Sequence, residues 1–278
     1  MRLGFHISIA GGLRQAVPRA VEKKCTAFQI FTSAPSQWGR ALITDDEALA
    51  FIAALKASQI SEVFIHAIYL LNLASASEDL RNKSIANLAD ELRRAGQIGA
   101  TGVIFHLGSA GKDGDPVKAR EHVCGSLAEV RKLSKCETPL ILENSAGAGA
   151  LVGSTLDDVY SIINNSAAAE PMNFCLDTAH AFESGVPLHK AEGLEAAMSH
   201  PRIGERLRVV HANDSMTRFE SHRDRHFHIG EGEIGREAFG RIVRHPRLRD
   251  VPLIMETPGD ENDDRRNMET MLALTDGL

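Results

Sequence analysis

The sequence predicts an α/β fold, a single-domain (β/α)8 barrel over residues 1–278, and three observations support this. Segments with helix signals separate short apolar runs, and six of these runs end on a side chain that binds divalent metals well. The runs number eight, at residues 3–8, 27–32, 62–67, 102–107, 139–144, 172–178, 207–212 and 251–256. Parallel strands that are buried on both faces read as near-continuous apolar runs, so each run is predicted as a strand.

The segments between the runs carry helix start signals. Thr44 and Glu47 form a capping-box pattern before ALAFIAALKA, and Ser75 with Glu78 forms a second one. The Asp-Pro pair at 115–116 opens the helical segment VKAREHVCGSLAEVRKL, because a cap residue there precedes a proline in the first turn. Helices are therefore expected between the strands.

An open, doubly wound sheet is the alternative arrangement. Such a sheet concentrates its site at one switch point between strands. A closed barrel lets side chains from strands three to eight converge at its C-terminal mouth, and the positions of the metal-binding residues favour this arrangement. No linker, low-complexity stretch or composition break indicates a second domain.

The composition is that of a globular protein, with 43% hydrophobic and 24% charged residues. No run approaches the roughly 18 apolar residues that span a bilayer, so no membrane partner is expected. The four cysteines show no CxxC pairing and are expected to be free thiols in a reducing cytoplasm. The formal net charge of −6 argues only weakly against a nucleic-acid partner, because bound divalent ions would add positive charge at one face.

Nine side chains that bind divalent metals well lie at or just after the C-terminal ends of the runs. They are His66, His106, Glu143, Asp177, His180, His211, Asp224, His226 and Glu256. A single histidine at a strand end is more often a hydrogen-bonded structural residue, and a single buried glutamate is more often salt-bridged. Burying four carboxylates without cations would be very costly, so the set as a whole predicts a cluster of two or three metal ions.

The ligand types narrow the metal and the chemistry. Mixed imidazole and carboxylate ligands suit zinc, manganese or iron, whereas magnesium and calcium prefer oxygen ligands. Two or three close ions polarise a phosphoryl group and generate hydroxide at neutral pH, which makes phosphodiester hydrolysis the leading prediction. A sugar isomerase or epimerase built on a metal-bearing barrel is the alternative, although it typically needs only one or two metals. A DNA- or metal-binding module without turnover is the third class.

Several multi-residue blocks occur in order along nearly the whole chain. They are GFHISIAGGL (4–13), HAIYLLNLA (66–74), FCLDTAH (174–180), HANDS (211–215), DRHFHIGEGEIG (224–235) and LIMETPG (253–259). In these blocks the chain resembles the endonuclease IV family, the metal-dependent apurinic/apyrimidinic endonucleases of base-excision repair. The resemblance implies a TIM barrel with three zinc ions, with manganese or iron as alternatives at one or more positions. It also implies hydrolysis of duplex DNA 5′ to an abasic site.

The resemblance divides the nine ligands among three ions that share one glutamate. The three shells are His66 and His106 with Glu143; Glu143 with Asp177, His211 and Glu256; and His180 with Asp224 and His226. Glu143 is also implied as the catalytic residue, which orients the attacking hydroxide. Because the ligands have to be unprotonated, activity is expected to fall below about pH 6.

Loops at the barrel mouth are implied to bind the duplex and to flip the abasic nucleotide into the pocket. The matching positions are Ser36, Gln37, Trp38, Tyr69, Leu70 and His222. Trp38 is the only tryptophan, and packing of its loop against the barrel is an equally weighted alternative role for it. Tyr69 is expected to stack on the duplex or to wedge into it. A monomer is expected, because the protein has to embrace a duplex.

Several loop positions depart from the family pattern. Ser36 and Met216 lie where the family commonly has arginine and lysine, and His222 lies where it often has a basic residue. Glu220 replaces a common glycine. Fewer positive charges near the phosphate path predict weaker DNA binding with a shallower salt dependence.

Overall fold

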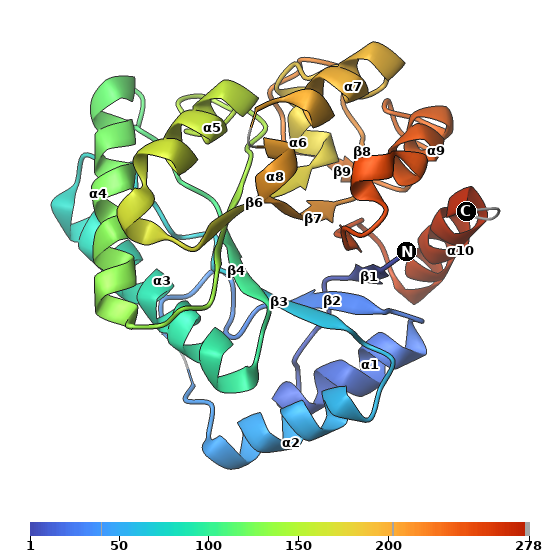
Figure 1. Ribbon diagram of the computed structural model, residues 1–278, viewed down its shortest axis with the longest axis horizontal. Coiled ribbons are helices and arrows are strands. Elements are labelled where there is room, and N and C mark those ends of the chain that lie inside the picture. The colour runs from blue at the N-terminus through green and yellow to red at the C-terminus, as the bar shows by residue number, and fades with distance from the viewer. Residues whose placement is uncertain (40, 202, 276–278) are drawn as a thin grey trace.

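The computed structural model of the chain describes residues 1–39, 41–201 and 203–275. Eight parallel strands form one sheet, in the neighbour order β1-β10-β7-β6-β5-β4-β3-β2, and helices surround it (Figure 1). The strands of this sheet are β1 (Leu3–Phe5), β2 (Ala27–Ile30), β3 (Glu62–His66), β4 (Gly102–Phe105), β5 (Leu140–Glu143), β6 (Met172–Asp177), β7 (Leu207–His211) and β10 (Leu253–Met255). Every predicted strand is present, with slightly shorter bounds than the apolar runs suggested.

The sheet closes on itself between β1 and β2. The Ile7 amide donates a hydrogen bond to the Gln29 carbonyl at 2.7 Å, and His6 and Gln29 form a parallel bridge. Only glycine fits at Gly4, because a Cβ there would lie 1.7 Å from the Ala27 carbonyl oxygen. The predicted (β/α)8 barrel is therefore confirmed in preference to the open sheet.

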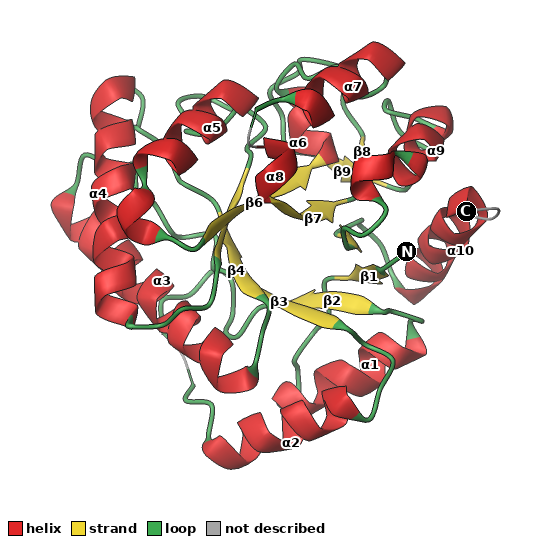
Figure 2. Ribbon diagram, viewed as in Figure 1, coloured by secondary structure: helices red, strands yellow, loops and turns green. Residues whose placement is uncertain are grey.

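Helices form the outer layer and the strands form the inner one (Figure 2). The helices are α1 (Ala16–Glu22), α2 (Asp45–Lys56), α3 (Glu78–Ile98), α4 (Pro116–Ser134), α5 (Leu156–Asn165), α6 (Thr178–Glu183), α7 (Ala191–Ser199), α8 (Ile203–Arg206), α9 (Arg236–Arg244) and α10 (Glu261–Thr275). No helix of the described residues has the length and apolar character needed to cross a bilayer. A small antiparallel pair, β8 (Asp214–Ser215) with β9 (His226–Phe227), follows β7 and was not predicted.

The helix caps agree with the sequence in part. Thr44 and Glu47 form the predicted capping box at the start of α2. The second predicted box is wrong. Ser77 and not Ser75 caps α3, by accepting a hydrogen bond from the Leu80 amide, while Ser75 Oγ accepts one from the Ser77 amide at 3.1 Å. Only Ser75 has a glutamate three residues later, so the pattern pointed to Ser75, but the helix begins two residues further along and Ser77 caps it without a capping box.

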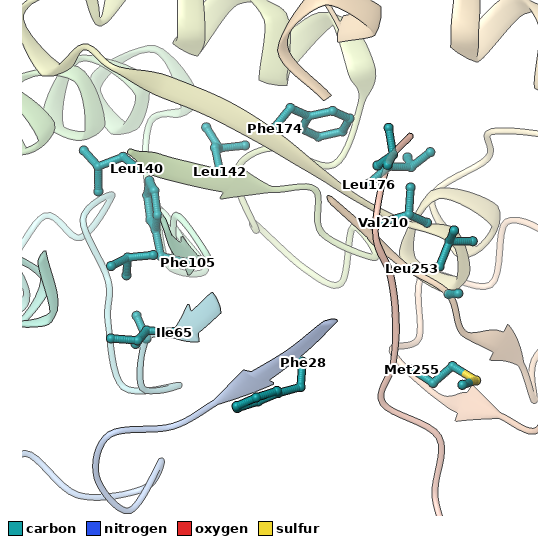
Figure 3. Packing of buried hydrophobic residues seen from close by; sticks show 14 of the residues in the cluster. Phe28, Ile65, Phe105, Leu140, Leu142, Phe174, Leu176, Val210, Leu253 and Met255 are labelled. Carbon is teal, nitrogen blue, oxygen red and sulfur yellow. The ribbon is translucent and has the colours of Figure 1, made fainter. Parts of the chain in front are cut away.

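Side chains on the strands alternate between two buried layers. Outward-facing residues such as Phe28, Ile65, Phe105 and Phe174 belong to the large hydrophobic core that the helices cover (Figure 3). A second, separate cluster fills the barrel interior and consists of Ala27, Phe64, Ile104, Ile141, Cys175, Val209 and Ile254. Because successive side chains on a strand point to opposite faces, the residue two positions further along each strand also faces the interior.

Candidate metal centre

The interior-facing residue two positions beyond the apolar barrel layer is polar on every one of the eight strands. These residues are His6, Gln29, His66, His106, Glu143, Asp177, His211 and Glu256. Six of them are predicted metal ligands, contributed by β3 to β7 and by β10. The carboxyl ends of parallel strands lie at one end of a barrel, so these side chains meet at a single mouth.

Glu143 lies at the centre of this group, with its side chain 1% exposed. Its Oε2 atom is 3.1 Å from His66 Nε2 and 3.6 Å from His106 Nε2. Its Oε1 atom is 3.0 Å from His211 Nδ1 and 3.4 Å from His180 Nδ1. The two carboxylate oxygens therefore face different sets of imidazoles, as a carboxylate that bridges two cations would.

A second group forms around Glu143 Oε1. His211 Nδ1 is 3.3 Å from Glu256 Oε2 and 4.0 Å from Asp177 Oδ2. One ligand atom from each of Glu143, Asp177, His211 and Glu256 lies within 4.8 Å of the other three. Three carboxylates and one imidazole thus converge on one small volume.

A third group lies at the outer side of the cluster. His180 Nε2 is 3.3 Å from Asp224 Oδ2. His226 Nε2 is 3.5 Å from Asp177 Oδ2 and 3.6 Å from Asp224 Oδ1. Asp177 therefore faces both the second and the third group, a double role that the sequence did not indicate. The Asp224 side chain is 60% exposed, so it forms the solvent side of the cluster.

The turn from β6 into α6 places two ligands at once. Asp177 ends the strand and caps the helix, and its Oδ1 accepts a hydrogen bond from the His180 amide at 2.7 Å. Because Asp177 is the cap and His180 lies in the first turn, both side chains reach the same mouth. Asn144 fixes this turn from the neighbouring strand: its Oδ1 accepts from the Asp177 amide at 2.8 Å, and its Nδ2 donates to the Asp177 carbonyl at 3.1 Å.

Backbone carbonyls orient three of the imidazoles. The Nδ1 atoms face carbonyl oxygens as follows: His66 faces Ala67 at 2.7 Å, His180 faces Asn144 at 3.0 Å and His226 faces Glu256 at 3.3 Å. A carbonyl oxygen can only accept, so each of these Nδ1 atoms carries the hydrogen. Nε2 is then the nitrogen that faces the carboxylates, and it is the one left available to bind a metal.

The charges of the cluster shift the pKa values of its members. Burial by itself raises the pKa of Glu143, but the charges of His106 and His211 outweigh it and hold this pKa well below 4.5. Burial by itself lowers the pKa of His180, but Asp177 and Asp224 raise it well above 6.5. Glu143 therefore stays ionised and His180 holds a balancing proton, which a divalent cation can replace.

These donors fit divalent metal ions. Glu143 and Asp177 are buried, and among the described residues no lysine or arginine pairs with them or with Glu256. Buried carboxylates without such partners need another cation. Imidazole and carboxylate donors together suit zinc, manganese or iron. Burial raises the pKa of Cys175 to about 12, so this neighbour of His211 is a neutral thiol, in line with the sequence interpretation of a small buried side chain.

Sequence reasoning missed Asn213 in this centre. Its Nδ2 donates to Asp177 Oδ2 at 2.7 Å, and its Oδ1 accepts from the Glu256 amide at 2.8 Å. Asn213 thus connects ligands of two strands. The available signal was its position in the block HANDS, two residues after His211.

Tyr69 and the 33–38 loop meet at one side of the mouth. The Tyr69 amide donates to the Pro35 carbonyl at 3.1 Å. The Tyr69 ring packs edge-on against Phe31, with centroids 5.2 Å apart, and its centroid is 6.0 Å from that of His66. The side chain is nevertheless 62% exposed, so much of it is free to contact a ligand beside the metal-binding cluster.

The other expected DNA-contact residues differ in exposure. Ser36, Gln37 and His222 are exposed. Trp38 and Leu70 are partly buried and pack against the hydrophobic core, which favours the packing role for Trp38. The His222 amide donates to the carbonyl of Glu183 at 2.9 Å, so its loop is tied to the barrel.

A buried carboxylate that the sequence reasoning missed anchors this loop. Glu183, at the end of α6, is 0% exposed. Its Oε1 atom accepts hydrogen bonds from Ser215 Oγ at 2.7 Å, from Thr217 Oγ1 at 3.1 Å and from the Arg225 amide at 3.2 Å. The loop between β8 and β9 carries Asp224, so Glu183 constrains the segment that supplies a cluster residue.

The same loop carries positive charge. Arg218, Arg223 and Arg225 are exposed, and no carboxylate of the described part of the chain forms an ion pair with them. Three guanidinium groups therefore lie on the loop that supplies Asp224, although Met216 is uncharged. The sequence predicts a loss of positive charge near the phosphate path, and these three arginines partly offset it.

The fold and the cluster together define this protein as a barrel with a metal-binding mouth. Comparison with known proteins agrees: residues 17–276 match a family model described as Xylose isomerase-like TIM barrel. The chain is 40% identical to a probable endonuclease 4 of Methanoculleus marisnigri over 93% of each chain. It is 37% identical to a probable endonuclease 4 of Trichlorobacter lovleyi, over 98% of this chain and 99% of that one. The chain belongs to the endonuclease IV family.

Solved structures agree with this assignment. Endonuclease IV from Thermus thermophilus matches with a TM-score of 0.89 and 35% identity, over 99% of this chain and 98% of that one. A D-tagatose 3-epimerase-like protein matches with a TM-score of 0.73 at 19% identity, over 99% and 97% of the two chains. The second similarity reflects the fold alone.

Proposed function

We propose that this chain is a metal-dependent endonuclease that hydrolyses the phosphodiester 5′ to abasic sites in duplex DNA. The observation that carries the proposal is the convergence of the nine predicted metal ligands around Glu143, in a chain that is 40% identical to a probable endonuclease 4. Sugar epimerisation, the alternative, has support only from the shared fold at 19% identity. The outer group of His180, Asp224 and His226 supplies more donors than such a reaction requires.

Three zinc ions are the proposed cofactors, with manganese or iron as alternatives at one or more positions. The residues that would hold them are His66, His106 and Glu143; Glu143, Asp177, His211 and Glu256; and His180, Asp224 and His226. When bound, such ions polarise the phosphoryl group, supply hydroxide at neutral pH and stabilise the departing oxygen.

Glu143 is the proposed catalytic residue. Its carboxylate is ionised and buried, and it faces imidazoles on both sides, so it is held in one orientation. A carboxylate held in this way can accept a hydrogen bond from an attacking water molecule and so orient it.

Tyr69 and the arginine-bearing loop 216–225 are proposed to hold the duplex. The exposed Tyr69 ring offers a stacking surface beside the cluster, and the guanidinium groups neutralise backbone phosphates. A nucleotide without a base is cheaper to flip, because less stacking and pairing is lost. We expect a monomer, so that the mouth can embrace a duplex, and we expect it in the cytoplasm, where the free cysteines stay reduced.

The direct test is incision of a duplex that carries one tetrahydrofuran abasic analogue by the zinc-loaded protein. We expect a nick 5′ to the analogue that leaves a 3′-hydroxyl, and no nick in the same duplex with an intact base. Glu143→Gln should abolish incision while the duplex is still bound. Glu237→Gln is the matched control, because this side chain is 93% exposed on α9. A fully metal-loaded protein that does not incise the analogue would refute the proposal.

A further inference from the structure

Gln29 occupies one of the eight polar interior positions and was not expected to have a role. It lies on β2 within the otherwise apolar run AFQIF and is 0% exposed. Its backbone also takes part in barrel closure, through the bridge with His6. Its side chain therefore points into the ring of predicted ligands from the strand next to the closure.

Both hydrogens of the Gln29 side-chain amide have an acceptor among these polar interior residues. Gln29 Nε2 lies 2.6 Å from Glu256 Oε1 and 2.9 Å from His6 Nδ1, and Gln29 Oε1 lies 2.8 Å from His211 Nε2. A carboxylate can only accept, so the amide nitrogen has to face Glu256. The reverse orientation would place a carbonyl oxygen against a carboxylate oxygen. The amide orientation is therefore determined by chemistry.

This orientation determines the tautomer of His211. Because Gln29 Oε1 has no hydrogen to give, His211 Nε2 has to carry the hydrogen of this contact. The other ring nitrogen, Nδ1, is then the one that faces Glu143 Oε1 at 3.0 Å and Glu256 Oε2 at 3.3 Å. His211 thus presents Nδ1 to the second group, whereas His66 presents Nε2 to its own group.

The hydrogen-bond acceptor that orients His211 differs in kind from those that orient His66, His180 and His226. Backbone carbonyls orient His66, His180 and His226, and no substitution can remove those. His211 depends on a side chain that comes from another strand. The same side chain holds Glu256 Oε1, which leaves Glu256 Oε2 directed at His211 Nδ1.

We propose that Gln29 is a positioning residue that fixes His211 as an Nδ1 donor and orients Glu256 within the group Glu143, Asp177, His211 and Glu256. The inference rests on metal binding, which is part of the proposed function, and not on the DNA substrate. Partners that orient a metal ligand usually contribute about 10- to 100-fold to metal affinity. We expect Gln29 to raise the affinity for the ion of this group and to leave the affinity for the other ions unchanged.

The test compares Gln29→Met, which keeps the size but not the polar atoms, with Ile30→Val, an apolar change on the outward face of the same strand. The probe is Zn²⁺ alone, and the readout is the zinc retained per protein during dialysis against graded chelator. We expect Gln29→Met to release one equivalent at a chelator concentration about 10- to 100-fold lower than wild type, with the remaining zinc unaffected. Ile30→Val should match wild type. Release of no ion early, or of every ion together, would overturn the proposal.

Side-chain ¹H–¹⁵N spectra of the zinc-loaded wild-type protein give a second readout that requires no variant to fold. We expect His211 to bind zinc through Nδ1 and to retain a hydrogen on Nε2; binding through Nε2 would overturn the proposal. Gln29→Glu separates the two contacts, because its carboxylate can accept from His211 but cannot donate to Glu256. It should keep the Nδ1 signature and still lose one zinc early. Wild-type protein that binds no zinc would overturn this inference together with the proposed function, whereas absent DNA incision by zinc-loaded protein would affect the function alone.

Discussion

His180 and His226 face each other through their Nε2 atoms, which lie 3.4 Å apart. Two unprotonated ring nitrogens repel each other at this distance, so a proton or a cation has to lie between or beside them. We predict that His226→Asn removes about one zinc per protein and lowers incision by at least about 100-fold, since it deletes a donor outright. Metal analysis and single-turnover incision measure the two effects.

The control for this prediction is His228→Asn, two residues further along the chain. The His228 ring contacts Asn267 Nδ2 at 3.2 Å and lies outside the three groups. It should leave zinc content and incision near wild type. Equal losses in both variants would show that the chain segment, and not the His226 donor, is responsible.

Glu183 is predicted to hold the loop that carries Asp224. Glu183→Ala removes the acceptor of three hydrogen bonds, so the free energy of unfolding should fall by about 1–3 kcal/mol. Amide hydrogen exchange should accelerate in residues 216–225 more than elsewhere. Glu183→Gln keeps one acceptor oxygen and should lie between wild type and Glu183→Ala. Unchanged exchange in this loop would contradict the anchoring role.

Tyr69 is predicted to contact the duplex through its ring. Tyr69→Ala should weaken binding of the abasic duplex by about 1–3 kcal/mol, the usual size of one base–aromatic stacking contact. Tyr69→Phe keeps the ring and should bind like wild type. Thermal stability of Tyr69→Ala should change little, because the side chain is 62% exposed. Fluorescence anisotropy with a catalytically inactive background measures the affinity, and equal binding by both variants would exclude stacking.

The salt dependence of DNA binding should report on the loop 216–225. Arg223→Ser is predicted to reduce the slope of log K against log salt by about 1, because one phosphate contact is lost. Lys132→Ser removes the same charge from a side chain that is 77% exposed on α4 and should leave the slope unchanged. Identical slopes for the two variants would mean that overall charge, and not this loop, governs binding.

Metal affinity is predicted to rise with pH through and above 6.5. Burial opposes ionisation of His180 and His211, but the surrounding negative charges raise the pKa of both well above 6.5. Zinc has to displace these protons, so its affinity falls as the pH drops through the raised pKa values. The gain in melting temperature on adding zinc to chelator-treated protein should therefore grow from pH 5.5 to pH 8. A gain that is independent of pH would contradict the prediction.

The same pKa shifts predict a stability optimum for chelator-treated protein. The pKa of Glu143 and of Glu256 is held well below 4.5, so their contribution to stability is present above pH 4.5 and is lost as the pH falls through the lowered values. The raised pKa values of the two histidines give a contribution that is complete below pH 6.5 and is lost as the pH rises through them. Melting temperatures without zinc should peak between these limits, at about pH 4.5 to 6.5.

The barrel strands were predictable because a strand buried on both faces needs an apolar run, and such runs are visible in one dimension. Glu143 and His211 stood out because each ends such a run with a group that is costly to bury. The β8–β9 pair was not predictable, since strands of two residues show no period. Glu183 was missed for a related reason, because its three donors come from β8 and from the loop that follows it, whose path the local sequence does not define.

By itself, the sequence determined which donors this protein has and which barrel strands carry six of them, because alternation and apolar runs are local properties. Only the tertiary structure decided how those donors are shared. Asp177 faces two groups, and Gln29 reaches His211 across 182 positions of the chain. Both relationships depend on closure of the barrel and on the register of its strands. These arise from packing and pairing between distant segments, which the local pattern of residues does not encode.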